Sequence, residues 1–293
     1  MLPARLLLVL GLLALATGCD GKPPTGPSGT PPPPPPAGEQ RSTGPIAFVS
    51  DRDGTEQIYL ANEDGSAVTR LTPGALPAWS RDGQRLAFNN ARGIYVINVD
   101  GSGLRHLARG WEPDWSPDGR MLVFRGASFT IDVVDVDGSN HRRLHDDGGD
   151  GAELYAPAWS PDGRRIAFIN GSYVSFGGLW VMNADGSDAR HIGPGELPAW
   201  SPDSSEIAFV ISRSIDVSNA DGSGRRTRVA GPATFPDWTP DGRLIFTKDP
   251  SGDWYGPGQR IFISDGGLER QLIPEAAAPA SSSYSDRQAT WRR

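Results

Sequence analysis

Residues 157–168 read PAWSPDGRRIAF, and similar stretches recur along the chain. Each copy combines a tryptophan, a turn of the Pro-Asp-Gly type and a short apolar run that ends in phenylalanine. The tryptophans are 36 to 53 residues apart. A period of ~40–45 residues that holds several short strands is typical of the blades of a β-propeller. The tryptophans of this structural repeat are Trp79, Trp115, Trp159, Trp200, Trp238 and Trp291.

Each repeat carries four short segments rich in β-branched and aromatic residues, as strands are. The first contains the tryptophan, the second is an apolar run such as Ile166–Phe168, and the third resembles Ile94–Ile97. The fourth ends at an apolar residue such as Leu107. Pro-Asp-Gly joins the first two segments and Asp-Gly-Ser joins the last two, and both are strong turn signals. The apolar second segment predicts a strand buried on both faces between neighbouring sheets.

The order of these segments predicts how the ring closes. The repeats begin with Pro45–Val49, which matches a second strand and has no tryptophan segment before it. They end with Ala289–Trp291, which matches a first strand and has no second strand after it. We therefore expect an all-β fold, a six-bladed β-propeller with four-stranded blades, whose C-terminal strand completes the N-terminal blade. This closure leaves no open sheet edge, and the tryptophans should fill the space between blades.

The repeat resembles that of the TolB family, whose propellers are built from WD40-like (PD40) repeats. Residues 157–168 carry the resemblance, together with the pattern Ile-Tyr-Val-x-Asn-x-Asp-Gly-Ser that follows the apolar run. Ser50–Gly54, followed by Gln57–Tyr59, strengthens it. The resemblance covers residues 44–293 and implies a six-bladed periplasmic propeller that binds other proteins. It does not extend to the role of TolB in the Tol–Pal system, because TolB carries an N-terminal α/β domain where this chain carries a proline-rich segment.

The first nineteen residues have the features of an export signal. Arg5 precedes an apolar run from Leu6 to Ala16, which is too short to span a bilayer as a helix. Small residues then precede Cys19, the only cysteine of the chain, and resemble the lipobox of bacterial lipoproteins. We expect a signal peptide over residues 1–18 and a lipid on Cys19. The alternative is an ordinary secretory signal followed by an incidental cysteine.

Residues 19–43 form the expected linker between this signal and the propeller of residues 44–293. They include six consecutive prolines, Pro31 to Pro36, and little apolar surface to bury. Such a sequence predicts a semi-rigid polyproline spacer. The expected location is the bacterial cell envelope, with the protein lipid-anchored in a membrane and facing the periplasm or the cell surface.

The composition argues against several classes of function. One cysteine excludes an intrachain disulfide framework and a cysteine-based zinc site. A formal net charge of −7 without a basic block makes a nucleic-acid partner unexpected. The chain has no Gly-x-Ser-x-Gly nucleophile motif, no Walker A motif and no dinucleotide glycine pattern. We therefore expect no catalytic residues, no cofactor and no resident metal.

Histidines and acidic loops are the remaining candidates for metal binding. His106 and His191 occupy a register at which other repeats carry arginine, which indicates a solvated outer strand rather than a metal ligand. The repeated Asp-Gly-Ser stretches are interpreted as hairpin turns. Asp51–Gly54 and Asp146–Asp150 are the two loops at which calcium binding stays open.

The connections outside the repeat carry additional aromatic residues. In a four-stranded blade both repeated turns lie on one rim of the disc, and the variable connections lie on the other. Aromatic residues in surface loops often become binding hot spots. We expect this variable rim to bind a protein partner, with a glycan as the alternative ligand. The candidate partner-binding residues are Trp111, Tyr155, Tyr173, Phe176, Trp254 and Tyr255.

Two other classes of function remain open. A hydrolase or lyase at the mouth of the channel would require three converging ionisable residues on one rim, with perturbed pKa values. A purely structural envelope component would lack an aromatic patch on its loops. The sequence itself favours binding, because it contains no catalytic motif.

Overall fold

The computed structural model describes residues 44–146, 151, 153–172, 175–249, 258–265, 267–273 and 285–291. The predicted signal peptide, the linker and the lipidated Cys19 lie outside these residues and stay predictions. Within the described ranges, no helix is long and apolar enough to cross a membrane.

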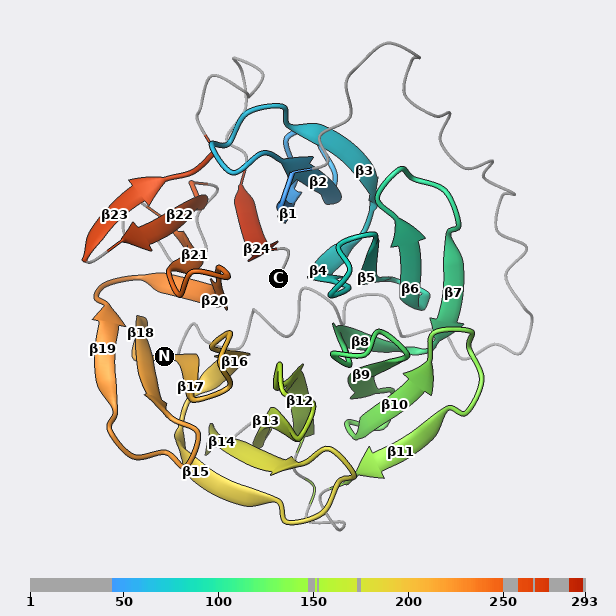
Figure 1. The fold of residues 1–293 in the computed structure, drawn as a ribbon, viewed down its shortest axis with the longest axis vertical. Helices are drawn as coiled ribbons and strands as arrows, with labels where there is room; N and C mark the ends of the chain where they lie inside the picture. Colours follow the sequence, from blue (N-terminus) through green and yellow to red (C-terminus); the bar gives the residue numbers. More distant parts are fainter. Residues whose placement is uncertain are drawn as a thin grey trace, which may run out of the picture. The chain divides into compact units, whose positions relative to one another are not determined.

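The described residues form six antiparallel sheets of four strands each. Figure 1 shows the sheets arranged as blades around a central axis, with the first strand of each blade innermost. This is the predicted six-bladed propeller. From inside to outside, blade 1 is β24 (Asp286–Trp291), β1 (Ile46–Ser50), β2 (Gln57–Ala61) and β3 (Thr69–Pro73). Blade 2 is β4 (Ala75–Trp79), β5 (Arg85–Asn90), β6 (Gly93–Asn98) and β7 (Arg105–Ala108). Blade 3 is β8 (Gly110–Trp115), β9 (Met121–Gly126), β10 (Ile131–Asp135) and β11 (Arg142–His145).

Blades 4 to 6 repeat the same order of strands. In each of them the second strand pairs with a strand on both sides and carries a buried apolar run, as the sequence predicts. Blade 4 is β12 (Glu153–Trp159), β13 (Arg165–Ser172), β14 (Ser175–Asn183) and β15 (Arg190–Pro194); blade 5 is β16 (Glu196–Trp200), β17 (Glu206–Ile211), β18 (Ser214–Asn219) and β19 (Arg226–Val229); blade 6 is β20 (Ala233–Trp238), β21 (Leu244–Lys248), β22 (Arg260–Asp265) and β23 (Leu268–Gln271).

The ring closes through the C-terminal strand, as predicted. β24 pairs with β1 in blade 1, with Trp291 opposite Ile46. Asp237 of blade 6 accepts hydrogen bonds on Oδ2 from the Thr290 hydroxyl at 2.8 Å and from the Trp291 backbone N–H at 3.0 Å. The last strand is therefore bonded both to the first strand of the chain and to the sixth blade.

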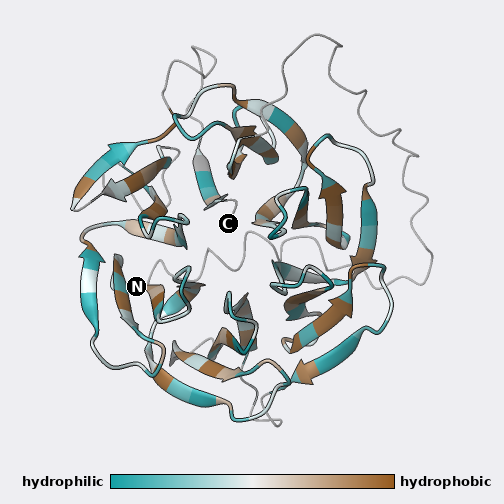
Figure 2. Cartoon of the chain, in the orientation of Figure 1, coloured by the Kyte–Doolittle hydropathy of each residue, from teal (hydrophilic) through white to brown (hydrophobic). Residues whose placement is uncertain are grey.

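The core lies between the blades rather than at the centre of the disc. The second strands are buried on both faces, as Leu122, Val123 and Phe124 of β9 illustrate with no exposed surface. The six repeat tryptophans are at most 7% exposed. Trp200 of blade 5, for example, packs in one cluster with Ala167 of blade 4. Figure 2 shows hydrophilic residues concentrated on the outermost strands, such as β7, β11 and β19.

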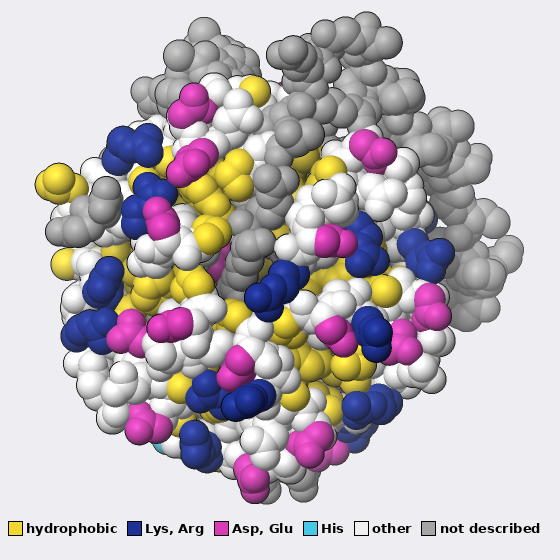
Figure 3. All heavy atoms as spheres, viewed as in Figure 1, with side chains coloured by type: hydrophobic (Ala, Val, Ile, Leu, Met, Phe, Trp, Pro, Cys, Tyr) yellow, Lys and Arg dark blue, Asp and Glu magenta, His cyan; other side chains and the backbone are white. Residues whose placement is uncertain are grey.

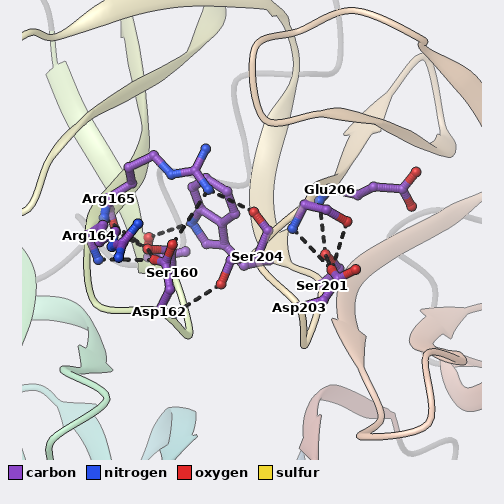
Figure 4. A network of polar contacts seen from close by, with 11 residues as sticks. Ser160, Asp162, Arg164, Arg165, Ser201, Asp203, Ser204 and Glu206 are labelled. Carbon is purple, nitrogen blue, oxygen red and sulfur yellow. Dashed lines mark hydrogen bonds and ion pairs between the residues drawn. The ribbon is translucent and has the colours of Figure 1, made fainter.

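The turns of the repeat lie on one rim, which we call the turn rim. In blade 4 the Ser160 hydroxyl donates to Asp162 Oδ1 at 2.6 Å and accepts the Arg165 N–H at 2.9 Å. Arg165 also donates to the Ser204 carbonyl of blade 5 at 2.8 Å, and Figure 4 shows the two turns side by side. Its guanidinium lies 4.7 Å from the Trp200 ring centroid. The turn therefore ties adjacent blades together as well as reversing the chain.

Candidate functional site

Every innermost strand carries a β-bulge three residues before its tryptophan. The pairing with the neighbouring strand shifts register at each bulge. The residue at the bulge has φ between 49° and 58°, in the left-handed region, which costs a non-glycine residue about 1–2 kcal/mol. We call these residues the bulge ring: Leu76, Glu112, Ala156, Leu197, Phe235 and Gln288.

Five of the six bulges coincide with a proline of the repeat. In five blades a proline comes directly after the bulge residue, and Ala289 takes this place in the sixth. Proline cannot donate a hydrogen bond to a neighbouring strand, so inside a sheet it is confined to edges and bulges. The six bulge residues are all half-buried. They belong to the half of each inner strand away from the turn rim, and we call that side of the disc the variable rim.

Side chains of the bulge ring also bond neighbouring blades to one another. Gln288 Oε1 of blade 1 accepts the Leu76 N–H of blade 2 at 3.1 Å. Glu112 Oε2 of blade 3 accepts the Ala156 N–H of blade 4 at 2.6 Å. At these two junctions a polar bulge residue therefore bonds the strained backbone of the next bulge, which ties neighbouring inner strands together on the variable rim.

Charged and aromatic side chains gather beside the bulges of blades 3 and 4. Arg125 Nη2 of β9 lies 3.8 Å from Glu153 Oε2 of β12, and the two side chains are only 17% and 14% exposed. The Arg125 guanidinium lies 5.6 Å from the Trp111 ring centroid and 4.6 Å from that of Phe129. Contacts of this kind attract a cation to the ring face. Together with Glu112, these residues form what we call the mouth cluster.

Glu112 of the mouth cluster and the nearby Tyr155 both have raised pKa values. Burial raises the pKa of Glu112, and the nearby Arg125 opposes this rise. Burial also raises the pKa of the Tyr155 hydroxyl, and the carboxylates of Glu196, Glu112 and Glu153 raise it further. Perturbed groups near a specific charge partner are frequent at functional sites. The mouth cluster thus holds a glutamate that takes up a proton at a higher pH than an exposed one, beside a fixed cation.

The structure corrects the placement of two predicted partner-binding residues. Trp111 and Tyr155 were predicted to lie in variable loops, but they lie within strands β8 and β12 and are half-buried. The prediction of loops was wrong because the bulge lets each inner strand continue beyond the proline. Tyr173, Trp254 and Tyr255 lie outside the described residues, as does the Phe176 side chain. The role of all six in partner binding stays a prediction.

Sequence reasoning missed Arg125 and Glu153. Arg125 stands at a core position of its repeat, where the pairing places Val49, Ile169 and Val210 in three other blades. The two remaining blades carry the uncharged Asn89 and Thr247 there, so the charge is the signal that marks Arg125. Glu153 has no comparable signal, because it precedes the part of the repeat that recurs.

The candidate metal sites show internal bonding instead. Asp53 Oδ2 accepts the Tyr59 hydroxyl at 2.5 Å and lies 3.8 Å from Arg70 Nη1. Asp51 Oδ1 accepts the Ser285 N–H at 2.7 Å. In the part of the chain that the structure describes, no group of three or more His, Cys, Asp or Glu residues could hold a metal ion. Residues 147–150 lie outside that part, so calcium binding there stays untested.

No protein-family model and no curated protein matches the sequence. Solved structures resemble its fold. TolB from Acinetobacter baumannii aligns with a TM-score of 0.67 at 17% identity, over 85% of this chain and 66% of that chain, so about a third of that TolB lies outside the match. A nidogen/laminin complex aligns with a TM-score of 0.67 at 13% identity, over 85% and 98%. An oligogalacturonate lyase in complex with manganese aligns with a TM-score of 0.52 at 19% identity, over 78% and 72%.

These identities are low, so the alignments show the fold alone. The fold includes the six blades, the four strands in each blade and the closure through β24. The chain therefore has a TolB-like six-bladed β-propeller fold.

Proposed function

We propose that this protein is a scaffold that binds a protein partner at its variable rim. The observation that carries the proposal is the mouth cluster, in which Trp111 and Arg125 are held against each other beside the strained bulge ring. Tryptophan and arginine are enriched among the residues that dominate binding energies. A preformed arrangement loses less conformational freedom on binding than a flexible loop does. The fold shared with TolB and with a propeller from a nidogen/laminin complex supports a protein partner in general.

The proposal places this scaffold on a membrane. Cys19 carries the lipid, and the linker of residues 19–43 holds the propeller away from the bilayer. A single acyl chain gives only marginal membrane binding, so stable anchoring needs at least two. The partner is then another component of the bacterial envelope.

The test is an affinity pull-down with the full chain from detergent-solubilised envelope membranes. Trp111→Ala removes the tryptophan side chain of the mouth cluster and leaves Phe129 in place. Arg109→Glu and Arg164→Glu form a matched pair, since both arginines are exposed but the first lies on the variable rim and the second on the turn rim. Thermal melting of each variant shows whether the propeller is still folded.

We expect a protein to be retained by the wild type and by Arg164→Glu, and to be lost or depleted with folded Trp111→Ala and Arg109→Glu. Loss with Arg164→Glu alone would place the interface on the turn rim and overturn the proposal. Retention of no protein by any bait would also count against it.

A second candidate is an enzyme at the same mouth, acting on a carbohydrate as a hydrolase or lyase. Glu112 favours it, because burial raises the pKa of this half-buried glutamate, so that beside Arg125 it holds a proton to a higher pH than an exposed glutamate does. The propeller of an oligogalacturonate lyase supports this class at the level of the fold. Glu112→Gln separates the two candidates: an enzyme loses turnover, whereas a scaffold retains its captured protein.

A further inference from the structure

A cavity of about 280 Å³ opens on the outer strands of blade 4, apart from the mouth cluster. It is formed where the ends of β13, β14 and β15 pair on the variable-rim side, with Gly178 opposite Asn170 on one strand and opposite Pro194 on the other. Its lining consists of Asn170, Gly177, Gly178, Trp180, His191 and Pro194.

Two ring nitrogens converge on the floor of this cavity. Trp180 and His191 are paired across β14 and β15, with their ring centroids 5.7 Å apart. A Cβ atom at Gly178 would lie 2.7 Å from His191 Nε2 and 3.2 Å from Trp180 Nε1. A side chain at position 178 would therefore collide with both rings, so the glycine is what allows the His191 ring and Trp180 Nε1 to lie this close to the strand.

These polar groups have no hydrogen-bond partner among the residues that the structure describes. Among the residues that the structure describes, no hydrogen bond joins Trp180 Nε1, the His191 ring or the Asn170 amide to another protein atom. The ring of Trp180 contacts only Phe168 and His191 as aromatic neighbours in this set. Three half-buried or exposed polar groups thus face one cavity, and none of them bonds another side chain or carbonyl of the described residues.

Other blades satisfy the same positions internally. In blade 2 the matching pair is Tyr95 and His106, and His106 Nε2 lies 3.3 Å from the Arg92 carbonyl oxygen. In blade 3 the position of Trp180 is taken by Asp132, whose carboxylate bonds the His141 ring at 2.8 Å. Blade 4 departs from this internal bonding while it keeps the same strand pairing. The departure points to a ligand rather than to a requirement of the fold.

The cavity offers the chemistry of a sugar site. The tryptophan N–H is a donor, the imidazole Nε2 is a donor or an acceptor according to its tautomer, and the asparagine amide is both. The indole ring and Pro194 supply apolar surface, and the lining contains no carboxylate, ammonium or guanidinium. A pyranose presents an apolar C–H face and a rim of hydroxyls that donate and accept. The volume lies just below the ~300 Å³ at which pockets for drug-sized ligands begin, which suits one such ring.

We propose that this cavity binds one neutral hexopyranose ring, either as a free sugar or as the end of a glycan. Trp180 Nε1, His191 Nε2 and the Asn170 amide bond its hydroxyls, and the cavity that these residues line receives the ring. The site is distinct from the mouth cluster, so it stands whether or not the variable rim docks a protein there.

The test is saturation-transfer NMR on the full chain with N-acetylglucosamine, its disaccharide, glucose and galacturonate as probes. The key variant combines Trp180→Phe with His191→Gln. These two residues are the pair that blade 6 itself carries at this register, as Phe262 and Gln271. The variant should therefore fold, and thermal melting checks that it does.

Two single variants complete the design. Gly178→Ala fills the floor of the cavity, and its nearest contacts are with the exposed His191 ring, which can turn away. His106→Gln in blade 2 changes the matching histidine of a blade whose histidine nitrogen already has a partner. It serves as the control.

We expect transfer to at least one neutral sugar in the wild type and in His106→Gln, and its loss in the double variant and in Gly178→Ala. Transfer to the disaccharide as well assigns the site to the end of a glycan, and transfer to the monosaccharide alone assigns it to a free sugar. Equal transfer in the wild type and the double variant would overturn the proposal. Transfer only to galacturonate, or to none of the probes, would overturn it too.

Discussion

At the scale of single residues, the repeat tryptophans are not equivalent. The Nε1 of Trp115, Trp200 and Trp238 each donates to the carbonyl of an alanine in the preceding blade, at 3.0–3.1 Å. Trp159 instead follows a blade that carries Asp114 at this position. Asp114 accepts the Trp159 backbone N–H at 2.6 Å. The Trp159 Nε1 is buried and has no hydrogen-bond partner among the described residues.

This difference predicts unequal costs for the same substitution. Trp238→Phe removes a buried hydrogen bond and leaves the Ala199 carbonyl without it, whereas Trp159→Phe removes a donor that has no partner. A buried polar group left unpaired costs about 1–3 kcal/mol. We expect the free energy of unfolding to fall further in Trp238→Phe, by roughly that amount, in denaturant titrations. Equal losses in the two variants would contradict this account of the tryptophans.

At the scale of the strand, the prolines of the inner strands coincide with β-bulges that shape each blade. In five blades a proline lies two residues before the repeat tryptophan and coincides with a bulge. The residue directly before this proline has a backbone in the left-handed region. The strand then continues past the bulge, which is why Trp111 and Tyr155 lie in strands rather than in loops. Proline at an innermost strand is therefore a signal of a bulge as well as of a turn.

The bulge predicts an unusual response to glycine. Ala156→Gly relieves left-handed strain of about 1–2 kcal/mol at a cost in chain entropy of about 0.5–1 kcal/mol. The Ala156 N–H that bonds Glu112 is retained. We expect thermal melting to show an unchanged or higher midpoint for this variant. The control Ala158→Gly lies two residues away without a positive φ and should lower the stability by about 0.5–1 kcal/mol. A larger loss at position 156 than at 158 would rule out stored strain.

At the scale of the whole molecule, closure makes the two ends of the propeller depend on each other. β24 supplies the only partner of the inner edge of β1 in blade 1, and it also bonds Asp237 of blade 6. On the face seen in Figure 1, acidic and basic side chains are interspersed rather than gathered on one blade, as Figure 3 shows. The ring is therefore held by sheet pairing and packing between blades.

Removal of residues 288–293 should destabilise the whole propeller rather than blade 1 alone. The deletion exposes the edge of β1, opens the junction with blade 6 and removes the buried Trp291. We expect a lower melting temperature with a single transition by circular dichroism. Deletion of residues 292–293 alone is the control and should leave the melting temperature unchanged. An unchanged melting temperature in the longer deletion would disprove closure through β24.

The sequence by itself determined the parts of this protein that repeat. Each blade makes the same internal contacts, so the same tryptophan, turn and apolar strand recur at each period and identify the blade, the number of blades and the closing strand. The sequence shows which aromatic and charged residues depart from the repeat, but it does not show which of them contact one another in the folded chain. Glu112, Arg125 and Glu153 come from three strands of two blades, and Trp180 meets His191 only through the pairing of β14 with β15. Only the tertiary structure decided these meetings, because contacts between strands and between blades depend on register and bulges that no single repeat encodes.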